Sequence, residues 1–123
     1  MGVKKIMVVD DEEDFCHFVK QNLEVEGEYQ VAACNESTRA VEQVQQFKPD
    51  LILLDILMPG LSGSEIAKQL KSRQETQTIP LLFLTALSLE KESDEYVLKP
   101  VSMNDLRDRI EQVLSRKGAA DRP

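Results

Sequence analysis

The stretch DLILLDILMPGLSG, residues 50–63, decides the fold of this chain. Residues 51–54 are apolar at every position, a pattern typical of a strand that is covered on both faces. Asp55 follows this run directly, and a turn at Met58-Pro59 comes after it. We therefore expect a central strand of a parallel sheet, with a rigidly held carboxylate at its carboxyl end.

Further apolar runs lie on both sides of this strand, at residues 6–9, 31–33, 81–84 and 96–98. Between the runs, apolar residues recur with the period of an amphipathic helix. The four helical stripes comprise Phe15, Phe18, Val19 and Leu23; Ala40, Val41, Val44 and Phe47; Ile66, Ala67 and Leu70; and Leu106, Ile110, Val113 and Leu114. Strands that alternate with helices predict βαβ units, and hence a doubly wound α/β domain with a parallel sheet of five strands.

Two serines mark places where helices begin. Ser62 with Glu65, and Ser102 with Asp105, match the pattern in which a serine side chain satisfies the free backbone N–H groups of a helix N-terminus. We therefore expect helices to start directly after residues 62 and 102.

Length and composition restrict the class of protein. A chain of 123 residues makes one domain. Its 15 Lys and Arg against 22 Asp and Glu give a formal net charge of −7, which disfavours nucleic acid and anionic membrane as ligands of this domain.

No apolar run approaches the roughly 18 residues of a membrane helix, and the start of the chain turns acidic too early for a signal peptide, so we expect a cytoplasmic protein. Cys16 and Cys34 have no CxxC spacing and are expected to be small buried hydrophobes in a reducing compartment.

Polar side chains follow four of the five apolar runs. Asp10 and Asp11 follow the first run, Asp55 the third, Thr85 the fourth and Lys99 the fifth. The carboxyl ends of parallel strands meet at one edge of the sheet, where ligands bind beside the topological switch point. We therefore expect three carboxylates, one hydroxyl and one ammonium to converge at this edge.

This set of groups favours a hard cation. Two carboxylates about 4 Å apart repel each other by about 4 kcal/mol at an effective dielectric constant near 20, and a third raises the cost. Mg²⁺ offsets this repulsion, because it prefers oxygen ligands and is typically bound by one or two carboxylates together with phosphate oxygens. A rigid aspartate beside Mg²⁺ and a lysine can act as a nucleophile toward a phosphoryl group, and Asp55 is the residue that we expect to do so.

Each of these residues also has an ordinary structural explanation. An acidic pair such as Asp10 and Asp11 commonly begins a helix, where it favours the positive end of the helix dipole. Taken singly, Asp55 is typical of a strand-ending turn, Thr85 of a strand and Lys99 of a solvated surface. The functional interpretation depends on the placement of all five at the strand ends of one sheet.

With these residues in place, the chain resembles the receiver domain of bacterial response regulators. The matching segments are residues 8–12 (VVDDE), 50–63, 85–86 and 96–100 (YVLKP), and the resemblance spans residue 6 to about residue 114. Each segment alone is a weak signal, but all of them in this order make a specific one. The resemblance implies a flavodoxin-like sheet in the order 2-1-3-4-5 and a regulatory phosphoacceptor rather than an enzyme that acts on a separate substrate.

The resemblance also implies which residues take part in phosphoryl transfer. Asp55 would accept a phosphoryl group from the phosphohistidine of a histidine kinase or phosphotransfer protein, and would later lose it by Mg²⁺-dependent hydrolysis in the same site. Mg²⁺ would be bound by Asp11, by Asp55 and by the backbone carbonyl of Leu57, and by Asp10 through a water molecule.

The remaining groups would bind the phosphoryl oxygens or respond to them. Lys99 would pair first with Asp55 and then with the phosphoryl oxygens, to which the Thr85 hydroxyl and the Ala86 amide would also donate hydrogen bonds. Movement of Thr85 would let Tyr96 turn inward, which would make this pair the switch of the domain.

The chain departs from the family between the fourth and fifth strands. Thirteen residues separate Thr85 from Lys99, fewer than in a typical receiver, and the stretch has no helical stripe. We therefore expect the fourth helix to be shortened or absent. The sheet face near Leu82, Leu84 and Val97 is then expected to be partly uncovered, and to recruit a second copy or an output-domain partner.

Two other functions fit parts of the pattern. A receiver-like binding module that acts through constitutive contacts or dimerisation would explain the short crossover, but not the five retained site residues. A phosphohydrolase of the haloacid-dehalogenase type would also use an aspartate nucleophile, but those proteins carry D-x-D, whereas Asp10 and Asp11 are adjacent. The chain has neither GxGxxG nor GxxxxGK[ST], which argues against dinucleotide or nucleotide binding.

The end of the chain has the composition of a linker. Residues 115–123 lose the apolar period and gain Gly, Ala and Pro. We therefore expect the receiver domain to cover residues 1–114 and a tail or linker, to which an output domain could be joined, to cover residues 115–123.

Overall fold

The elements of the chain alternate between strand and helix. A computed structural model describes residues 2–85, 96–99 and 101–120, the last four of these as backbone only. In chain order the elements are β1 (Lys4–Val9), α1 (Glu13–Glu24), β2 (Tyr29–Cys34), the 3-10 helix η1 (Ser37–Arg39), α2 (Ala40–Phe47), β3 (Leu51–Asp55), α3 (Gly63–Lys71), β4 (Leu81–Thr85), β5 (Tyr96–Leu98) and α4 (Met103–Ala120). Every strand and every helix that the apolar pattern predicts is present among the described residues.

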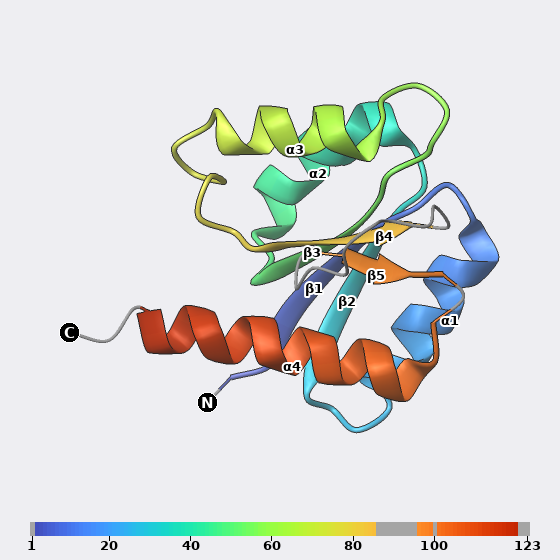
Figure 1. The fold of residues 1–123 in the computed structure, drawn as a ribbon, viewed down its shortest axis with the longest axis vertical. Coiled ribbons are helices and arrows are strands. Elements are labelled where there is room, and N and C mark those ends of the chain that lie inside the picture. Colours follow the sequence, from blue (N-terminus) through green and yellow to red (C-terminus); the bar gives the residue numbers. More distant parts are fainter. Residues whose placement is uncertain (1, 86–95, 100, 121–123) are drawn as a thin grey trace.

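The five strands form one parallel sheet in the order β2-β1-β3-β4-β5 (Figure 1). All five residues of β3 are buried, as are the last four of β1. These two strands lie inside the sheet, which is why their sequences are apolar at successive positions rather than at alternate ones. The doubly wound α/β fold with strand order 2-1-3-4-5 is confirmed.

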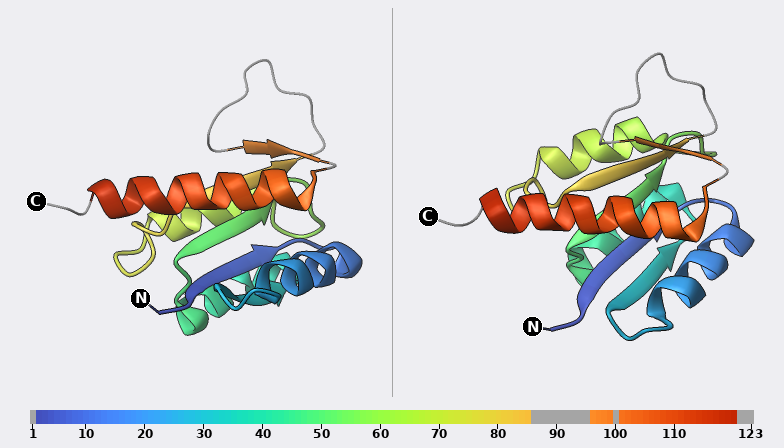
Figure 2. Two further views of the ribbon diagram at one scale, coloured as in Figure 1. Left: turned by 90° about the horizontal axis from the view of Figure 1, so that it is seen from below. Right: turned by 60° about the horizontal axis from the view of Figure 1, so that its bottom comes forward.

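Helices cover both faces of the sheet, α1 and α4 on one face and α2 and α3 on the other (Figures 1 and 2). Each face has its own apolar core. The core under α1 and α4 includes Cys16, Val19, Leu23, Leu106, Ile110 and Val113, and the core under α2 and α3 includes Cys34, Ala40, Val44, Ile66, Ala67 and Leu70. Both cysteines are buried and free, as expected.

One residue of the first predicted helical stripe is wrongly placed. Phe18 is 46% exposed, whereas Cys16, Val19 and Leu23 of α1 are buried. Two residues of a helix correspond to slightly more than half a turn, so Phe18 lies on the side of α1 away from Cys16. The thiol therefore occupies the position in the core that the pattern assigned to an aromatic ring.

The expectation of a partly uncovered sheet face is also wrong for the three side chains named. Leu82 and Leu84 are fully buried and Val97 is 5% exposed, because they belong to the same core as Leu106 and Ile110 of α4. The segment expected to contain a shortened or missing fourth helix, residues 86–94, lies outside the described residues.

The predicted helix starts are confirmed, but the last helix is longer than its apolar stripe. The Ser62 hydroxyl accepts a hydrogen bond from the Glu65 amide at 3.2 Å, and Ser102 accepts one from Asp105 at 3.1 Å. α4 continues to Ala120, into the expected tail, because Arg, Lys and Ala favour a helix without an apolar stripe. Among the described helices, none is both long and apolar enough to cross a membrane.

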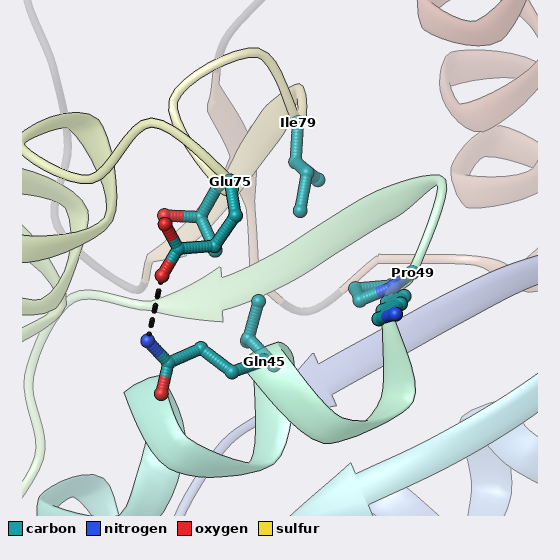
Figure 3. Close-up of a pocket in the computed structure, with 7 residues that line it drawn as sticks. Gln45, Pro49, Glu75 and Ile79 are labelled. Carbon is teal, nitrogen blue, oxygen red and sulfur yellow. Dashed lines mark hydrogen bonds between the residues drawn. The ribbon is translucent and has the colours of Figure 1, made fainter.

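A cavity of about 320 Å³ lies near the amino ends of β3 and β4 (Figure 3). A hydrogen bond of 3.0 Å from Gln45 of α2 to the Glu75 carboxylate spans it. Its lining residues are Val44, Gln45, Lys48, Pro49, Glu75, Thr76 and Ile79. None of the residues predicted to carry chemistry lines this cavity, because those residues follow the carboxyl ends of the strands at the opposite edge of the sheet.

Candidate functional site

Backbone pairing continues past the strand ends and carries the site residues to the carboxyl edge of the sheet. The amide of Asp10 donates to the carbonyl of Cys34 at 3.1 Å, which extends the pairing of β1 with β2. The amide of Lys99 donates to the carbonyl of Thr85 at 2.7 Å, which extends the pairing of β4 with β5. The positions of these residues therefore follow from the sheet itself.

Three carboxylates gather at this edge. One oxygen atom from each of Asp10, Asp11 and Asp55 lies within 4.8 Å of the other two. Asp10 is fully buried and Asp55 is 6% exposed, while Asp11 is exposed. The cluster therefore presents oxygen ligands only and is open to solvent on the side of Asp11, an arrangement that suits a hard cation such as Mg²⁺.

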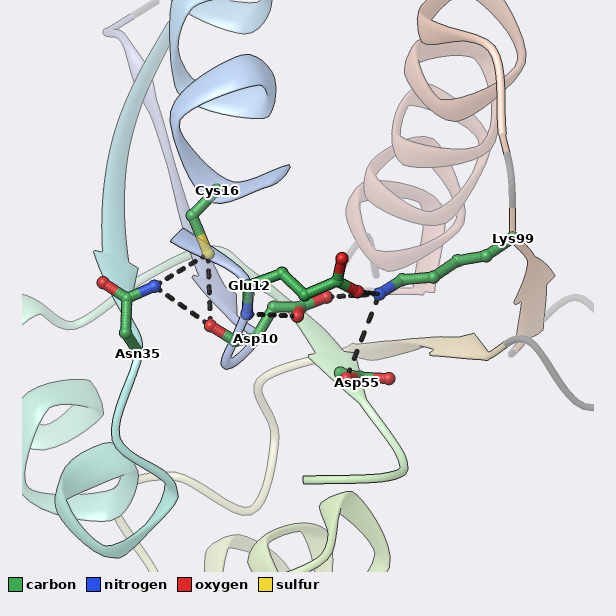
Figure 4. A network of polar contacts seen from close by, with 6 residues as sticks. All are labelled: Asp10, Glu12, Cys16, Asn35, Asp55 and Lys99. Atoms are coloured by element: carbon green, nitrogen blue, oxygen red, sulfur yellow. Dashed lines mark hydrogen bonds and ion pairs between the residues drawn. The ribbon is translucent and has the colours of Figure 1, made fainter. Parts of the chain in front are cut away.

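The Lys99 ammonium points toward Asp10 and Asp55 of this cluster (Figure 4). Its Nζ atom is 2.6 Å from Asp10 Oδ2, 3.4 Å from Glu12 Oε1 and 3.9 Å from Asp55 Oδ2. It also lies 4.5 Å from the centre of the Phe15 ring, a cation–π contact. The expected pair with Asp55 is therefore present, but the shortest contact of the ammonium is with Asp10.

The environment of Asp55 disfavours its charged form. Burial raises the pKa of Asp55 to about 6, and the charges of Asp10 and Asp11 add to the increase, although the Lys99 ammonium acts against it. Burial lowers the pKa of Lys99, but its hydrogen bond to Asp10 and the neighbouring carboxylates raise it above the ordinary value overall. At neutral pH, Asp55 is therefore ionised, with a negative charge that its surroundings offset only in part, and Lys99 is protonated.

Thr85 and Tyr96 lie on neighbouring strands. Thr85 ends β4 and is 1% exposed, next to Lys99 in the backbone pairing. Tyr96 begins β5, is half-buried, and stacks on the Phe83 ring with centroids 5.3 Å apart. The Arg109 guanidinium of α4 donates to the Tyr96 carbonyl at 2.7 Å. Ala86, which was expected to donate to a phosphoryl group, lies outside the described residues.

The loop of residues 56–62 joins Asp55 to α3. The Leu57 amide hydrogen-bonds the Asp55 carboxylate, and the Leu57 side chain is 59% exposed. The Gly63 amide donates to the Ile56 carbonyl at 2.8 Å, which brings the start of α3 back onto the end of β3. A Cβ atom at Gly63 would collide with the Asp55 carbonyl, so only glycine permits this approach.

Asn35, which follows β2, also contributes to the site, although none of the predicted site residues comes from this strand end. The Asn35 side-chain amide donates to the Asp10 carbonyl at 3.0 Å and contacts the Cys16 sulfur at 3.3 Å, while the Cys16 thiol donates to the same carbonyl at 3.4 Å (Figure 4). Burial and the nearby Asp10 charge raise the pKa of Cys16 to about 12. Asn35 directly follows β2. It could therefore have been predicted by examining the polar residue after the second apolar run, as was done for the other four runs.

Comparison with known proteins agrees with the resemblance to receiver domains. Residues 6–111 match the family model described as the response regulator receiver domain. The chain is 39% identical over 125 residues to the alkaline phosphatase synthesis transcriptional regulatory protein PhoP of Bacillus subtilis, covering 95% of this chain and 51% of that protein. It is 38% identical over 120 residues to the phosphate regulon transcriptional regulatory protein PhoB of Rhizobium meliloti, covering 91% and 52%. The chain thus spans about half the length of these curated relatives.

Solved structures share the fold. A CheY-like response regulator receiver domain protein from Methanospirillum hungatei has a TM-score of 0.86 at 24% identity, covering 97% of this chain and 99% of that one. The signal receiver domain of a signal transduction histidine kinase from Syntrophus aciditrophicus has a TM-score of 0.81 at 30% identity, covering 92% and 91%. The sheet order, the strand-end residues and the family match together place this chain in the response regulator receiver domain family of two-component systems.

Proposed function

We propose that this domain is a phosphorylation-dependent signalling switch in which Asp55 accepts a phosphoryl group from the phosphohistidine of a histidine kinase or phosphotransfer protein. The observation that carries the proposal is the cluster of Asp10, Asp11 and Asp55 oxygen atoms within 4.8 Å of one another, with the Lys99 ammonium 3.9 Å from Asp55. Three carboxylates and one ammonium leave uncompensated negative charge, which favours binding of a divalent cation.

The residues present fit Mg²⁺. In the proposal, Asp11, Asp55 and the Leu57 carbonyl bind the ion directly, and Asp10 binds it through water. All of these donors are oxygen atoms, as Mg²⁺ requires, and Asp10 already holds the Lys99 ammonium at 2.6 Å. When bound, the ion supplies positive charge that stabilises the oxygens of the transferring phosphoryl group.

Phosphoryl transfer then depends on the protein groups around Asp55. A carboxylate oxygen of Asp55 attacks phosphorus, the bond from phosphorus to the donor imidazole nitrogen breaks, and the electron pair of that bond returns to the imidazole. With a pKa of about 6, Asp55 is mostly ionised at neutral pH and can act as the nucleophile. Lys99 pairs with the phosphoryl oxygens, and Thr85 and the Ala86 amide donate hydrogen bonds to them. Hydrolysis of the acyl phosphate returns the aspartate.

The output of the switch is proposed to pass through Thr85 and Tyr96. Their positions on paired strands support this assignment: Tyr96 pairs with Phe83, two residues before Thr85, so movement of Thr85 toward a phosphoryl group changes the space beside β5. The named relatives are transcriptional regulatory proteins about twice as long as this chain. We therefore propose that an output domain, joined beyond α4, or a second copy of the chain responds to the change.

The proposal is tested by incubating the chain with acetyl phosphate and Mg²⁺ and measuring its intact mass. We expect a gain of one phosphoryl group that is lost when EDTA replaces Mg²⁺ and that does not occur in Asp55→Asn. Beryllofluoride, which mimics the phosphoryl group, is expected to shift the oligomeric state of the chain. A constitutive binding module would show neither response.

A further inference from the structure

We propose that Ser37 is a positioning residue that holds the 56–62 loop in the conformation needed to bind the metal ion. The inference rests on the proposed function, in which the Leu57 carbonyl and Asp55 bind one ion. It assigns a role to η1, an element that lies outside every motif of the sequence.

The Ser37 hydroxyl makes two hydrogen bonds to the loop. It donates to the Pro59 carbonyl at 2.6 Å and accepts from the Leu61 amide at 2.8 Å. Ser37 is only 5% exposed, although it is polar and begins the short helix η1. One buried side chain therefore satisfies two backbone groups of a segment more than 20 residues away in the chain, which ties the loop to η1.

The fit between this hydroxyl and the loop is close. Gly60 lies between the two bonded residues, with a φ of +87° that favours glycine. A Cβ atom at Gly60 would lie 2.6 Å from Ser37 Oγ, so a larger residue could not occupy this place without displacing the hydroxyl. The sequence thus provides both a turn of the required conformation and the space that the hydroxyl needs.

The loop is held on both sides of Leu57. The Gly63 amide fixes Ile56 at one point, and Ser37 fixes Pro59 and Leu61 at the other. The loop is already ordered in the folded protein, so binding of the ion does not have to fix the position of its ligands. The conformational entropy of the loop is therefore lost during folding and not during metal binding. Loss of the Ser37 hydroxyl is therefore expected to weaken Mg²⁺ binding by about tenfold, as is typical of groups that orient metal ligands.

The variant Ser37→Ala tests this role, and Thr76→Ala is its matched control. Thr76 is 3% exposed, and its hydroxyl donates to the Leu70 carbonyl at 2.6 Å beside the cavity at the opposite edge of the sheet. Both variants lose a buried hydroxyl and are expected to lose similar thermal stability. Mg²⁺ alone is titrated into each protein, and its dissociation constant is measured from amide chemical shifts.

The expected result is weaker Mg²⁺ binding in Ser37→Ala and unchanged binding in Thr76→Ala, with recovery in Ser37→Thr. Equal affinities in wild type and Ser37→Ala would overturn the inference, as would an equal loss in both alanine variants. A measurement on the wild type covers the case in which Ser37→Ala does not fold. The Leu61 amide is expected to be protected from hydrogen exchange without Mg²⁺, and rapid exchange there would contradict an ordered loop.

Failure of this inference is distinguishable from failure of the proposed function. Phosphorylation of the wild type by acetyl phosphate is measured separately from the Mg²⁺ titration, with Thr76→Ala as the variant that is expected to reach the same extent. If the wild type binds Mg²⁺ but gains no phosphoryl group, the proposed function is wrong while the role of Ser37 in metal binding is still decided by the titration.

Discussion

At the scale of the residue, Asp55 carries a charge that the folded protein accommodates poorly. Burial and Asp10 raise its pKa from 3.8 to about 6. Between these two pH values the folded protein binds a proton that the unfolded chain has released, so the free energy of unfolding falls as the pH rises through this range. The group proposed to accept phosphate is therefore one that destabilises the metal-free domain at neutral pH.

Asp55→Asn is accordingly expected to stabilise the metal-free protein at pH 7, by about 1 to 3 kcal/mol for a shift of this size. The gain is expected to shrink toward zero near pH 3, which lies below the pKa of Asp55 in both states, so that Asp55 of the wild type is mostly protonated whether folded or unfolded. Urea unfolding in EDTA at the two pH values measures this difference. Equal stability of the two proteins at pH 7 would contradict the electrostatic account of the site.

Lys99 stabilises the metal-free protein, because its ammonium lies 2.6 Å from the fully buried Asp10 carboxylate. Lys99→Met leaves that charge unpaired beside two further carboxylates and is expected to cost about 3 kcal/mol in the absence of metal. Since Mg²⁺ replaces the missing positive charge, it should stabilise Lys99→Met more than the wild type. Thermal unfolding of both proteins with and without Mg²⁺ checks this, and equal stabilisation would argue against a shared cation site.

At the scale of the element, the geometry of the site depends on how α3 returns to the end of β3. Gly63 begins α3, where alanine would normally favour the helix. Its missing Cβ instead lets the Asp55 carbonyl and the Ile56 Cα approach the helix backbone. For Gly63→Ala, helix propensity alone therefore predicts a gain in stability, whereas the close approach to β3 predicts a loss.

Gly63→Ala is expected to destabilise the protein by about 2 kcal/mol or more, because the added methyl group overlaps the backbone rather than a movable side chain. Gly2→Ala is the control, since a Cβ there meets nothing within 4 Å. Chemical unfolding of both variants measures the difference. A neutral or stabilising effect of Gly63→Ala would mean that α3 is not held against the end of β3 as described.

The elements also show why some features could be predicted from the sequence and others could not. Strands buried on both faces have continuous apolar runs, so β3 was placed to within one residue. The burial of Phe18 was predicted wrongly because the apolar residues of a short helix fit either of two neighbouring faces. In the structure Cys16 lies on the buried face and Phe18 does not. The contacts of Ser37 have no periodic signal, since they depend on which loops the sheet order brings together.

At the scale of the whole molecule, the two faces of the sheet each carry one cysteine. Cys16 lies in the core under α1 and α4, and Cys34 in the core under α2 and α3. Both thiols are buried and burial raises the pKa of each, to about 12 for Cys16, so neither is a reactive thiolate in the folded state. They therefore report independently on the opening of the two layers.

If the domain unfolds as one cooperative unit, both thiols should be labelled by an alkylating reagent at the same slow rate, which is set by global unfolding. Peptide mass spectrometry after timed labelling measures the two rates separately. Labelling of one cysteine much earlier than the other would show that one helical layer opens by itself, and that the sheet with its two helical layers does not behave as a single structure.

The convergence of residues from positions 10 to 99 at one edge of the sheet could be predicted from the strand ends in the sequence, whereas the strand order 2-1-3-4-5 was implied by the resemblance to the receiver family. The pairing of Lys99 primarily with Asp10 could not be predicted, because it depends on the lengths and directions of side chains within the assembled edge. The burial of Leu82, Leu84 and Val97 likewise follows from the packing of α4, which the apolar pattern of β4 and β5 does not specify.

The central claim is that Asp55 accepts the phosphoryl group, and chemical trapping of the acyl phosphate tests it most directly. The chain is incubated with acetyl phosphate and Mg²⁺, reduced with borohydride, which converts an aspartyl phosphate to homoserine, and digested for peptide sequencing by mass spectrometry. The account predicts homoserine at position 55 only, and only when both the phosphoryl donor and Mg²⁺ are present. Homoserine at another aspartate, or none under these conditions, would contradict it.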